Sequence, residues 1–249
     1  MRIPRIFVPH PLASGSDVEL PVQAGEHLAR VLRLERGHPL ILFNSDGREY
    51  RGEIATLAKR RVTAHVLDTG TEVTRESPLR ITLAQGVARG EKMDWILQKA
   101  TELGVAHIVP LIAERTEVKL DAERAERRVT HWQAVIASAC EQCGRTRLPT
   151  LAEPVRLANW AAVLGDGNSV VDDALRLALD PVGEHRPRDT RIAASMILVV
   201  GPEGGLSEYD LATLRLAGFA GLRLGPRILR TETAGLAAIA ALQAIHGDS

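Results

Sequence analysis

Two turns that contain glycine and proline carry the residues best suited to hold a ligand. The first lies in VVGPEGGLSEYD, from Val199 to Asp210, and the second lies in LRLGPRILRTETAGL, from Leu222 to Leu236. Each turn follows an apolar run that predicts a strand and precedes a helical pattern. Glycine lets a ligand approach the backbone closely, and open α/β folds bind ligands where parallel strands end. The turns therefore predict a shared pocket, although a tight turn without a ligand would also explain the first.

The composition of the first turn argues against a phosphate ligand. Neither turn ends in the Gly-Lys-Ser/Thr of a phosphate loop, and neither contains the G-x-G-x-x-G of a dinucleotide site. Glu203 would repel a phosphate held by the same turn. Ser207 is a natural N-cap for the helix that follows. The sequence thus favours a ligand without phosphates, held by backbone groups.

The second turn leads into a dense polar cluster and then an apolar helix. Five polar residues crowd into seven positions, namely Arg227, Arg230, Thr231, Glu232 and Thr233. Helix capping with a local ion pair would also explain part of this cluster. The helix AGLAAIAALQAI is apolar on most faces, so we expect it to be buried in the core or against another subunit.

Two sets of basic residues are candidates for contacts with phosphates, although ordinary surface charge would also explain those near the N-terminus. Arg89 and Lys92 stand at a predicted strand–helix junction, where a solvated helix start is the alternative explanation. Residues 1–61 hold ten Lys and Arg against seven Asp and Glu, and the candidates for phosphate contacts there are Arg2, Arg5, Arg30 and Arg33. Aromatic residues make up only 3% of the chain, so stacking on aromatic rings is not the main device for binding bases.

The elements that position these residues fall into two regions. Residues 1 to about 75 are β-rich, with a hairpin signal at Ser45-Asp46-Gly47, a strand from Val62 to Leu67 and a short helix within Gly25–Gly37. The polar segment from Thr71 to Pro78 is a plausible linker. Beyond it, strands and helices alternate, which predicts a mostly parallel sheet covered by helices. The strands expected there are Ile81–Val87, His107–Ile112, Ser169–Val171, Met196–Val200 and Leu222–Leu224, and the helices are Glu91–Leu103, Ala122–Cys143, Ala158–Leu164, Ser207–Ala217 and Thr231–Ile245.

Overall composition excludes several classes of protein. The chain has 249 residues, a formal net charge of zero, and no uninterrupted apolar run long enough to span a membrane. The N-terminus lacks the apolar stretch of a signal peptide. Cys140 and Cys143 form a single C-x-x-C without the partners that a zinc site needs. We therefore expect a cytoplasmic protein without a metal site, a disulfide framework or a membrane segment.

Six stretches of the chain resemble the RsmE family of bacterial 16S ribosomal RNA uridine N3 methyltransferases, which belongs to the SPOUT group. They are MRIPRIF at 1–7, HLARVLRL at 27–34, RGEKMDWILQKATELGV at 89–105, ACEQCGR at 139–145, GPEGGLS at 201–207 and LGPRILRTETA at 224–234. The resemblance covers nearly the whole chain. Residues from about 151 to 195 are the least similar to the family.

The resemblance implies a fold and a cofactor. It implies a PUA-like β-barrel that binds RNA over residues 1–74, followed over residues 75–249 by an α/β SPOUT domain with a C-terminal trefoil knot. It also implies a homodimer and a pocket for S-adenosylmethionine. Carried over by motif, the pocket comprises Val200, Gly201, Pro202, Glu203, Gly204, Leu224, Gly225, Leu229, Arg230, Thr231, Thr233 and Ala234, with Val171 and Asp172 at a nearby strand end.

The implied reaction is methyl transfer to N3 of one uridine in the 16S RNA of the small ribosomal subunit. Because N3 is protonated at neutral pH, the enzyme must help to remove a proton. Arg230 is the candidate for stabilising the uridine anion, and either Glu203 or Glu232 is the candidate base. Arg89, Lys92 and Arg145 would add RNA contacts to those of Arg2, Arg5, Arg30 and Arg33.

Two rival interpretations remain open on the sequence alone. A related SPOUT enzyme could act instead on transfer RNA, for example on a ribose 2′-hydroxyl. Alternatively, an RNA-binding assembly factor could retain a vestigial pocket, although the intact LGPRILRTETA argues against decay. A phosphate-loop nucleotide hydrolase is excluded by the missing Lys-Ser/Thr.

Overall fold

The computed structural model describes residues 3–58, 61–118, 121–165 and 173–248. The chain folds into two compact units. Unit 1 comprises Met1–Glu76 together with Ala137–Leu148, and unit 2 comprises Ser77–Ile136 together with Pro149–Ser249. In the described residues, no helix is both long and apolar enough to cross a membrane.

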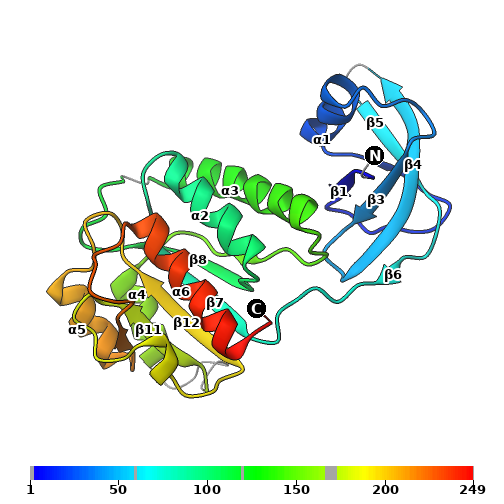
Figure 1. Ribbon diagram of the computed structural model, residues 1–249. Coiled ribbons are helices and arrows are strands. Elements are labelled where there is room, and N and C mark those ends of the chain that lie inside the picture. Colours follow the sequence, from blue (N-terminus) through cyan, green and yellow to red (C-terminus); the bar gives the residue numbers. More distant parts are fainter. Residues whose placement is uncertain (1–2, 59–60, 119–120, 166–172, 249) are drawn as a thin grey trace. The chain divides into compact units, whose positions relative to one another are not determined.

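Unit 1 is built on a six-stranded, mostly antiparallel sheet (Figure 1). Its strands are β1 (Arg5–Phe7), β2 (Asp17–Glu19), β3 (Pro39–Phe43), β4 (Arg48–Ala58), β5 (Arg61–Val66) and β6 (Thr71–Glu72). They follow the order β1-β3-β4-β5-β2, with β6 paired to β4, and only β1 and β3 run parallel. The β3–β4 turn contains Ser45 and Gly47, both with positive φ, which confirms the predicted hairpin.

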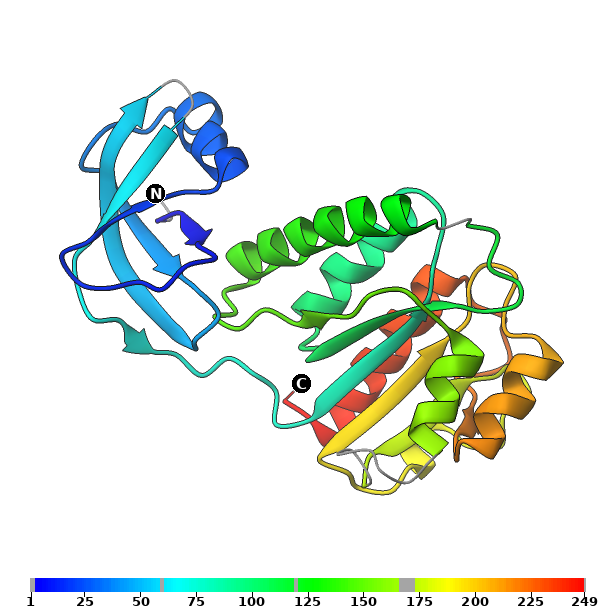
Figure 2. The same ribbon diagram turned by 180° about the vertical axis from the view of Figure 1, so that it is seen from behind.

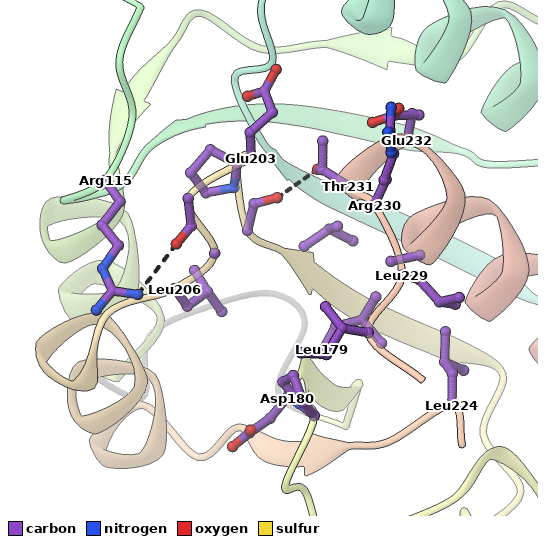
Figure 3. Close-up of a pocket in the computed structure, with 18 of the residues that line it drawn as sticks. Arg115, Leu179, Asp180, Glu203, Leu206, Leu224, Leu229, Arg230, Thr231 and Glu232 are labelled. Carbon is purple, nitrogen blue, oxygen red and sulfur yellow. Dashed lines mark hydrogen bonds between the residues drawn. The ribbon is translucent and has the colours of Figure 1, made fainter. Parts of the chain in front are cut away.

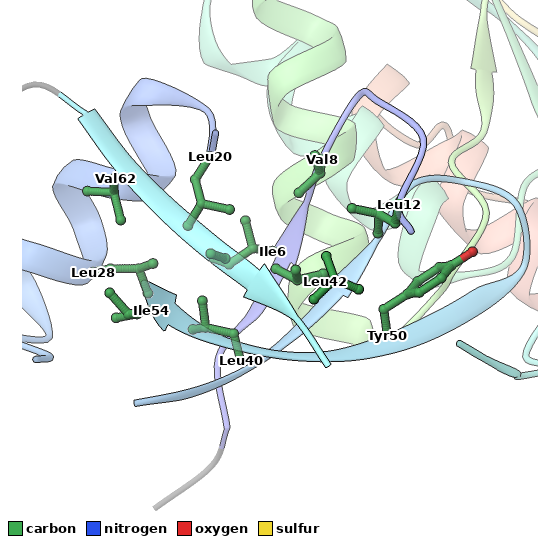
Figure 4. Close-up of a cluster of buried hydrophobic side chains, with 12 residues drawn as sticks. Ile6, Val8, Leu12, Leu20, Leu28, Leu40, Leu42, Tyr50, Ile54 and Val62 are labelled. Atoms are coloured by element: carbon green, nitrogen blue, oxygen red, sulfur yellow. The ribbon is translucent and has the colours of Figure 1, made fainter. Parts of the chain in front are cut away.

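The core of unit 1 comes from the alternation of its strands. Leu40 and Leu42 of β3 and Ile54 of β4 point to the same side and are fully buried (Figure 4). The short helix lies earlier than predicted, as α1 (Val22–Glu26) followed by a π-helical turn, η1 (His27–Val31). A Cβ atom on Gly25 would approach Val62 Cγ2 to 2.9 Å, so glycine allows α1 to lie against β5.

Residues 137–148 belong to unit 1 because its strands and loops bind them. The backbone N–H of Phe7 donates to Glu141 Oε1 at 3.0 Å, and that of Leu148 donates to Ser45 Oγ at 2.9 Å. Thr146 Oγ1 donates to the Val73 carbonyl at 3.2 Å. These bonds span more than 70 residues of sequence, and no local pattern predicted them.

Unit 2 contains a parallel sheet with the order β10-β8-β7-β12-β11-β13, and β9 pairs with β8. The strands are β7 (Arg80–Gly86), β8 (His107–Ile112), β9 (Thr150–Leu151), β10 (Val155–Arg156), β11 (Leu175–Leu179), β12 (Ser195–Val200) and β13 (Ala220–Leu222). The helices are α2 (Glu91–Glu102), α3 (Ala122–Cys143, which continues into unit 1), α4 (Leu157–Gly165), α5 (Glu208–Leu216) and α6 (Thr231–His246). The predicted alternation of strands and helices around a parallel sheet is therefore confirmed.

Helices cover both faces of this sheet. Figures 1 and 2 show α2 and α6 on one face and α4 and α5 on the other. On the α4–α5 face, Leu157, Ala161 and Leu214 pack with inward-facing Ala84 and Val199 of the strands. One face of α6 is buried, whereas Ala237, Ala240, Ala244 and Ile245 on the other face are exposed.

Two strand predictions need correction. The strand between α4 and β12 is β11, Leu175–Leu179, in a segment for which we predicted none. The strand predicted at Ser169–Val171 falls outside the described residues. β13 ends at Leu222, so Leu224 belongs to the following loop. A short 3₁₀ turn, η2 (Pro187–Asp189), lies between β11 and β12.

Candidate functional site

A cavity of about 560 Å³ lies at the carboxyl ends of β11, β12 and β13 in unit 2 (Figure 3). The loops after these three strands supply most of its walls, because β11 lies between β12 and β13 in the sheet. Its lining residues are Lys92, Arg115, Leu179–Pro181, Val200–Leu206, Leu211, Leu222, Leu224, Gly225, Arg227–Glu232 and Ala234.

The loop after β12 is held in shape by a helix cap and by glycines. Ser207 Oγ accepts from the backbone N–H of Asp210, while the Asp210 carboxylate accepts from that of Ser207, each at 3.0 Å. A Cβ atom on Gly201 would lie 2.8 Å from the Leu206 nitrogen, and one on Gly86 would lie 2.4 Å from the Pro202 nitrogen. Only glycine allows the end of β7 and this loop to pack so closely.

The loop after β13 is tied to the loop after β12 by Thr231. Buried Thr231 donates from Oγ1 to the Gly201 carbonyl at 2.6 Å. The same oxygen accepts from Gln85 Nε2 at 3.0 Å, and Gln85 is fully buried at the end of β7. Gly235 lets α6 approach this junction, since a Cβ atom there would lie 3.3 Å from Val200 and 3.4 Å from Gln85 Oε1. Thr231 therefore connects three elements at the cavity.

The walls of the cavity combine leucines, glycines and carboxylates. Leu179, Leu206 and Leu224 provide apolar surface, and Figure 3 shows all three around the opening. Asp180 is 6% exposed; its Oδ1 accepts from the Val182 N–H at 3.0 Å, and Oδ2 lies 3.7 Å from Arg215. Lys92, Arg115, Arg227 and Arg230 also line the cavity. Such a lining suits an organic ligand with an apolar body and charged groups, and the size of the cavity is typical of small-molecule sites.

The Glu203 carboxylate joins the loop after β12 to the residues that follow β7, and we call this set of contacts the Glu203 clamp. Its Oε1 accepts from the Arg89 backbone N–H at 3.0 Å and from Lys92 Nζ at 3.2 Å. Burial alone would raise the pKa of Glu203, but these bonds and its own backbone N–H outweigh burial and hold the pKa below its usual value. Glu203 is thus ionised and already occupied by hydrogen-bond donors at neutral pH.

Arg230 and Glu232 lie together at the start of α6 (Figure 3). Arg230 is exposed and takes the N-cap position. Glu232 Oε2 is buried and accepts no hydrogen bond from any residue that the structure describes. A buried carboxylate oxygen without a donor is rare in proteins and is a candidate for a functional role.

Comparison with known proteins places the chain in a family. Residues 75–243 match the profile of an RNA methyltransferase domain, and residues 20–67 match that of an RNA methyltransferase PUA domain. A relative from Buchnera aphidicola named ribosomal RNA small subunit methyltransferase E is 30% identical, covering 99% of this chain and 98% of its own.

The chain belongs to the ribosomal RNA small subunit methyltransferase E family. A crystal structure of that enzyme from Neisseria gonorrhoeae bound to S-adenosylmethionine is 37% identical, with a TM-score of 0.90 over 99% of each chain. A Legionella pneumophila protein solved with S-adenosylmethionine is 40% identical, with a TM-score of 0.93 over 100% of each chain. These findings confirm the resemblance to the RsmE family and the PUA-like domain.

The structure brings together most of the residues that the family motifs suggested for the pocket. Val200, Gly201–Gly204, Leu224, Gly225, Leu229–Thr231 and Ala234 line the cavity. Thr233 is exposed and does not line it. Val171 and Asp172 lie outside the described residues. The cavity also has walls that sequence reasoning missed, and the principal ones are Leu179, Asp180, Leu206, Leu211 and Ile228.

Two of the arginines predicted to bind RNA are structural residues of unit 1, and the prediction for them is corrected. Arg5 is 8% exposed, pairs with Glu49, and donates to the carbonyls of Gly144 and Arg145 at 3.1 Å. Arg145 is 4% exposed and pairs with Glu76 at 2.5 Å. A guanidinium group enclosed by such partners is not available to a phosphate.

The other predicted RNA-binding residues have varied surroundings. Arg30 is exposed and lies 3.5 Å from Glu26, and Arg33 is exposed with φ of 53°. Arg89 pairs with Glu117, and Lys92 both pairs with Glu203 and lines the cavity. Arg2 lies outside the described residues.

Neither metal binding nor a disulfide has support in the described part of the chain. No group of three or more His, Cys, Asp or Glu side chains gathers there in an arrangement that would hold a metal ion. Cys140 and Cys143 are both free thiols. Burial raises the pKa of Cys140 to about 12, so it is a core residue of unit 1 rather than a nucleophile.

Proposed function

We propose that this chain is an S-adenosylmethionine-dependent methyltransferase that acts on N3 of a specific uridine in 16S ribosomal RNA of the small subunit. The observation that carries the proposal is the cavity between the two Gly-Pro loops of unit 2, in a chain of the RsmE family. The structures of relatives of 37% and 40% identity were solved with bound S-adenosylmethionine, and the former is named as a methyltransferase of the small-subunit RNA.

The residues of the cavity fit this cofactor. S-adenosylmethionine has an adenosine, a sulfonium, an ammonium and a carboxylate, and no phosphate. Leucines and glycines suit the adenosine. Carboxylates and cations both line the cavity, which suits a ligand that carries positive and negative groups; they are Asp180, Glu203 and Glu232, and Lys92, Arg115, Arg227 and Arg230. When bound, the cofactor supplies an electrophilic methyl group.

The binding set consists of the motif residues that line the cavity together with the walls the structure adds. We assign cofactor binding to Val200, Gly201, Pro202, Glu203, Gly204, Leu224, Gly225, Leu229, Arg230, Thr231 and Ala234, with Leu179, Asp180 and Leu206. Thr231 acts by holding the Gly201 carbonyl, which fixes the distance between the loops after β12 and β13. Preorganised loops lower the entropic cost of binding.

The two candidate bases differ in availability, and Glu232 is the better one. Glu203 Oε1 already accepts two hydrogen bonds, and its lowered pKa makes it a weaker proton acceptor. Glu232 Oε2 has no donor among the described residues. Arg230 is exposed beside it, so its guanidinium can stabilise negative charge as the N3 proton leaves.

Because N3 lies on the pairing edge of uracil, the uridine must be unpaired or flipped out before reaction. The domain arrangement we propose is an RNA-binding PUA-like barrel over 1–74 and a SPOUT domain with a trefoil knot over 75–249, of which residues 137–148 pack with unit 1. The exposed alanines of α6 suit close packing against a second copy, which supports a homodimer. The enzyme would act in the cytoplasm, where ribosomal subunits are assembled.

Transfer of a radiolabelled methyl group from S-adenosylmethionine tests the substrate class. Small subunits from cells lacking the activity and unmodified transfer RNA are offered separately. We expect label only in the small-subunit RNA. Label only in transfer RNA would favour the related SPOUT enzyme, and tight cofactor binding without any transfer would favour an assembly factor.

A further inference from the structure

A second cavity, of about 550 Å³, lies on the other side of the loop that follows β13. Its lining residues are Arg186–Arg188, Arg223–Pro226 and Ile245. Leu224 and Gly225 line both this cavity and the candidate cofactor cavity, so one short loop separates the two. None of the family motifs or predicted site residues accounts for its three arginines.

The backbone holds these arginines in place. The N–H of Arg223 donates to the His185 carbonyl at 2.8 Å, and the N–H of His185 donates to the Gly221 carbonyl at 3.1 Å. This pairing sets the segment before η2 beside the end of β13. Arg186 and Arg223, 37 residues apart in sequence, therefore line the same cavity by virtue of the fold.

The charge of this cavity is unbalanced. Three guanidinium groups line it, and no carboxylate is among its lining residues. Within the described part of the chain, Arg186 and Arg223 make no side-chain hydrogen bond or ion pair, and Arg188 lies 3.8 Å from the exposed Asp189. Two of these three guanidinium groups thus have no counterion among the described residues, which favours an anionic ligand, and arginine is the residue best suited to phosphate.

Apolar residues complete the cavity. Pro187, Leu224, Pro226 and Ile245 supply surface that a bare inorganic anion would not use but that a ribose or base can cover. Arg227 and Arg230 line the cofactor cavity, which shares this loop, and neither makes a side-chain hydrogen bond or ion pair with a residue that the structure describes. The cavity thus suits a nucleotide of a polymer that also enters the candidate active site.

We propose that Arg186, Arg188 and Arg223 form a binding site for a backbone phosphate of the RNA strand, close to the uridine that is methylated. This proposal rests on the proposed function, because it assumes that the strand enters at Arg230. Its role is to fix the strand on unit 2 itself, independently of contacts made by unit 1. A second copy of the chain seated in the cavity is the competing occupant.

The test compares equilibrium binding of small ribosomal subunits by the wild type and by the double variant Arg186→Gln/Arg223→Gln. The matched control is Arg127→Gln/Arg191→Gln, which removes two exposed arginines outside the cavity that lie 3.4 Å from Glu123 and 3.3 Å from Asp173. Subunits from cells lacking the methylation serve as the probe. Affinity for S-adenosylmethionine and the sedimentation of each protein are measured in parallel.

We expect the double variant to bind subunits roughly 10-fold more weakly, with a slope of log affinity against log salt that is smaller by about 0.7, the value for one phosphate of a single strand. Its cofactor affinity and oligomeric state should match those of the control. Unchanged subunit affinity and salt slope would overturn the phosphate site and leave the proposed function intact. Dissociation of the double variant into monomers would overturn the phosphate site and would indicate that this cavity is an interface between two copies of the chain. A wild type that neither binds nor methylates subunits would instead contradict the proposed function.

Discussion

The Thr231 hydroxyl donates a 2.6 Å hydrogen bond to the Gly201 carbonyl, which joins the first turn of α6 to the loop after β12. Gln85 at the end of β7 donates to the same hydroxyl. The hydroxyl therefore links three segments at the wall of the candidate cofactor cavity, with Gly201 lying 30 residues and Gln85 lying 146 residues from Thr231 in sequence. Cofactor binding should depend on this one hydroxyl.

Replacement of Thr231 by valine should weaken cofactor binding. Valine keeps the shape of threonine but leaves the Gly201 carbonyl and Gln85 Nε2 without this partner, at a cost of about 1–3 kcal/mol. We expect the dissociation constant for S-adenosylmethionine, measured by titration calorimetry, to rise roughly 10-fold. The control is Thr130→Val at an exposed position of α3, and this variant should bind as the wild type does. Equal affinity of the two variants would contradict the role given to Thr231.

Replacement of Glu232 should lower turnover much more than replacement of Glu203. Glu232→Gln removes the carboxylate that is free to accept a proton, so kcat should fall by about 10² or more with little change in cofactor affinity. Glu203→Gln weakens the clamp to Arg89 and Lys92 and should lower kcat by less than about 10-fold. Single-turnover assays measure both. Loss of turnover only in Glu203→Gln would reverse the assignment.

The Glu203 clamp should also contribute to stability in a pH-dependent way. The pKa of Glu203 is lower in the folded chain than in the unfolded chain, so its contribution is present above pH ~4.5 and is lost as pH falls through the lowered value. At pH 7, Glu203→Gln should cost about 0.5–1 kcal/mol of unfolding free energy. The difference should shrink on acidification, whereas exposed Glu153→Gln should show none. A difference that grows as the pH falls would refute this reading of the clamp.

The two cysteines should differ sharply in reactivity. Because burial raises the pKa of Cys140 to about 12, only roughly one thiol in ten thousand would be ionised at pH 8. Cys143 is only partly buried. Iodoacetamide labelling mapped by mass spectrometry should modify Cys143 in the native chain and Cys140 only after unfolding. Rapid native labelling of Cys140 in a Cys143→Ser variant would show that this part of unit 1 opens readily.

Elements with a strong local pattern could be predicted from the sequence. The helices α2 and α3 and the strand β8 have bounds at or near those expected, because each has a sustained apolar period and a clear end. β11 was missed because it is five residues long and is specified by parallel pairing with β12 and β13. Pairing between distant strands leaves no local signal.

The candidate site likewise contains residues that could be predicted from the sequence and residues that could not. The two loops that contain glycine and proline, and the polar cluster Arg230–Thr233, could be predicted from the sequence because their residue types are unusual for a turn. Asp180 could not be predicted, because it follows β11, a strand that we did not predict, and a single aspartate there resembles any loop residue. Arg5 resembled a surface charge in sequence, yet Glu49 and the carbonyls of Gly144 and Arg145 enclose it. Its partners lie 44 to 140 residues away.

Nucleoside analysis of the product tests the central claim most directly. Purified enzyme is incubated with methyl-labelled S-adenosylmethionine and small subunits from cells that lack the activity. The RNA is then digested and its nucleosides are separated by mass spectrometry. Labelled 3-methyluridine, in an amount of about one per small-subunit RNA, is the result we predict. A labelled 2′-O-methyl nucleoside, or unmodified RNA in the presence of enzyme with bound cofactor, would contradict the assignment of uridine N3 as the target.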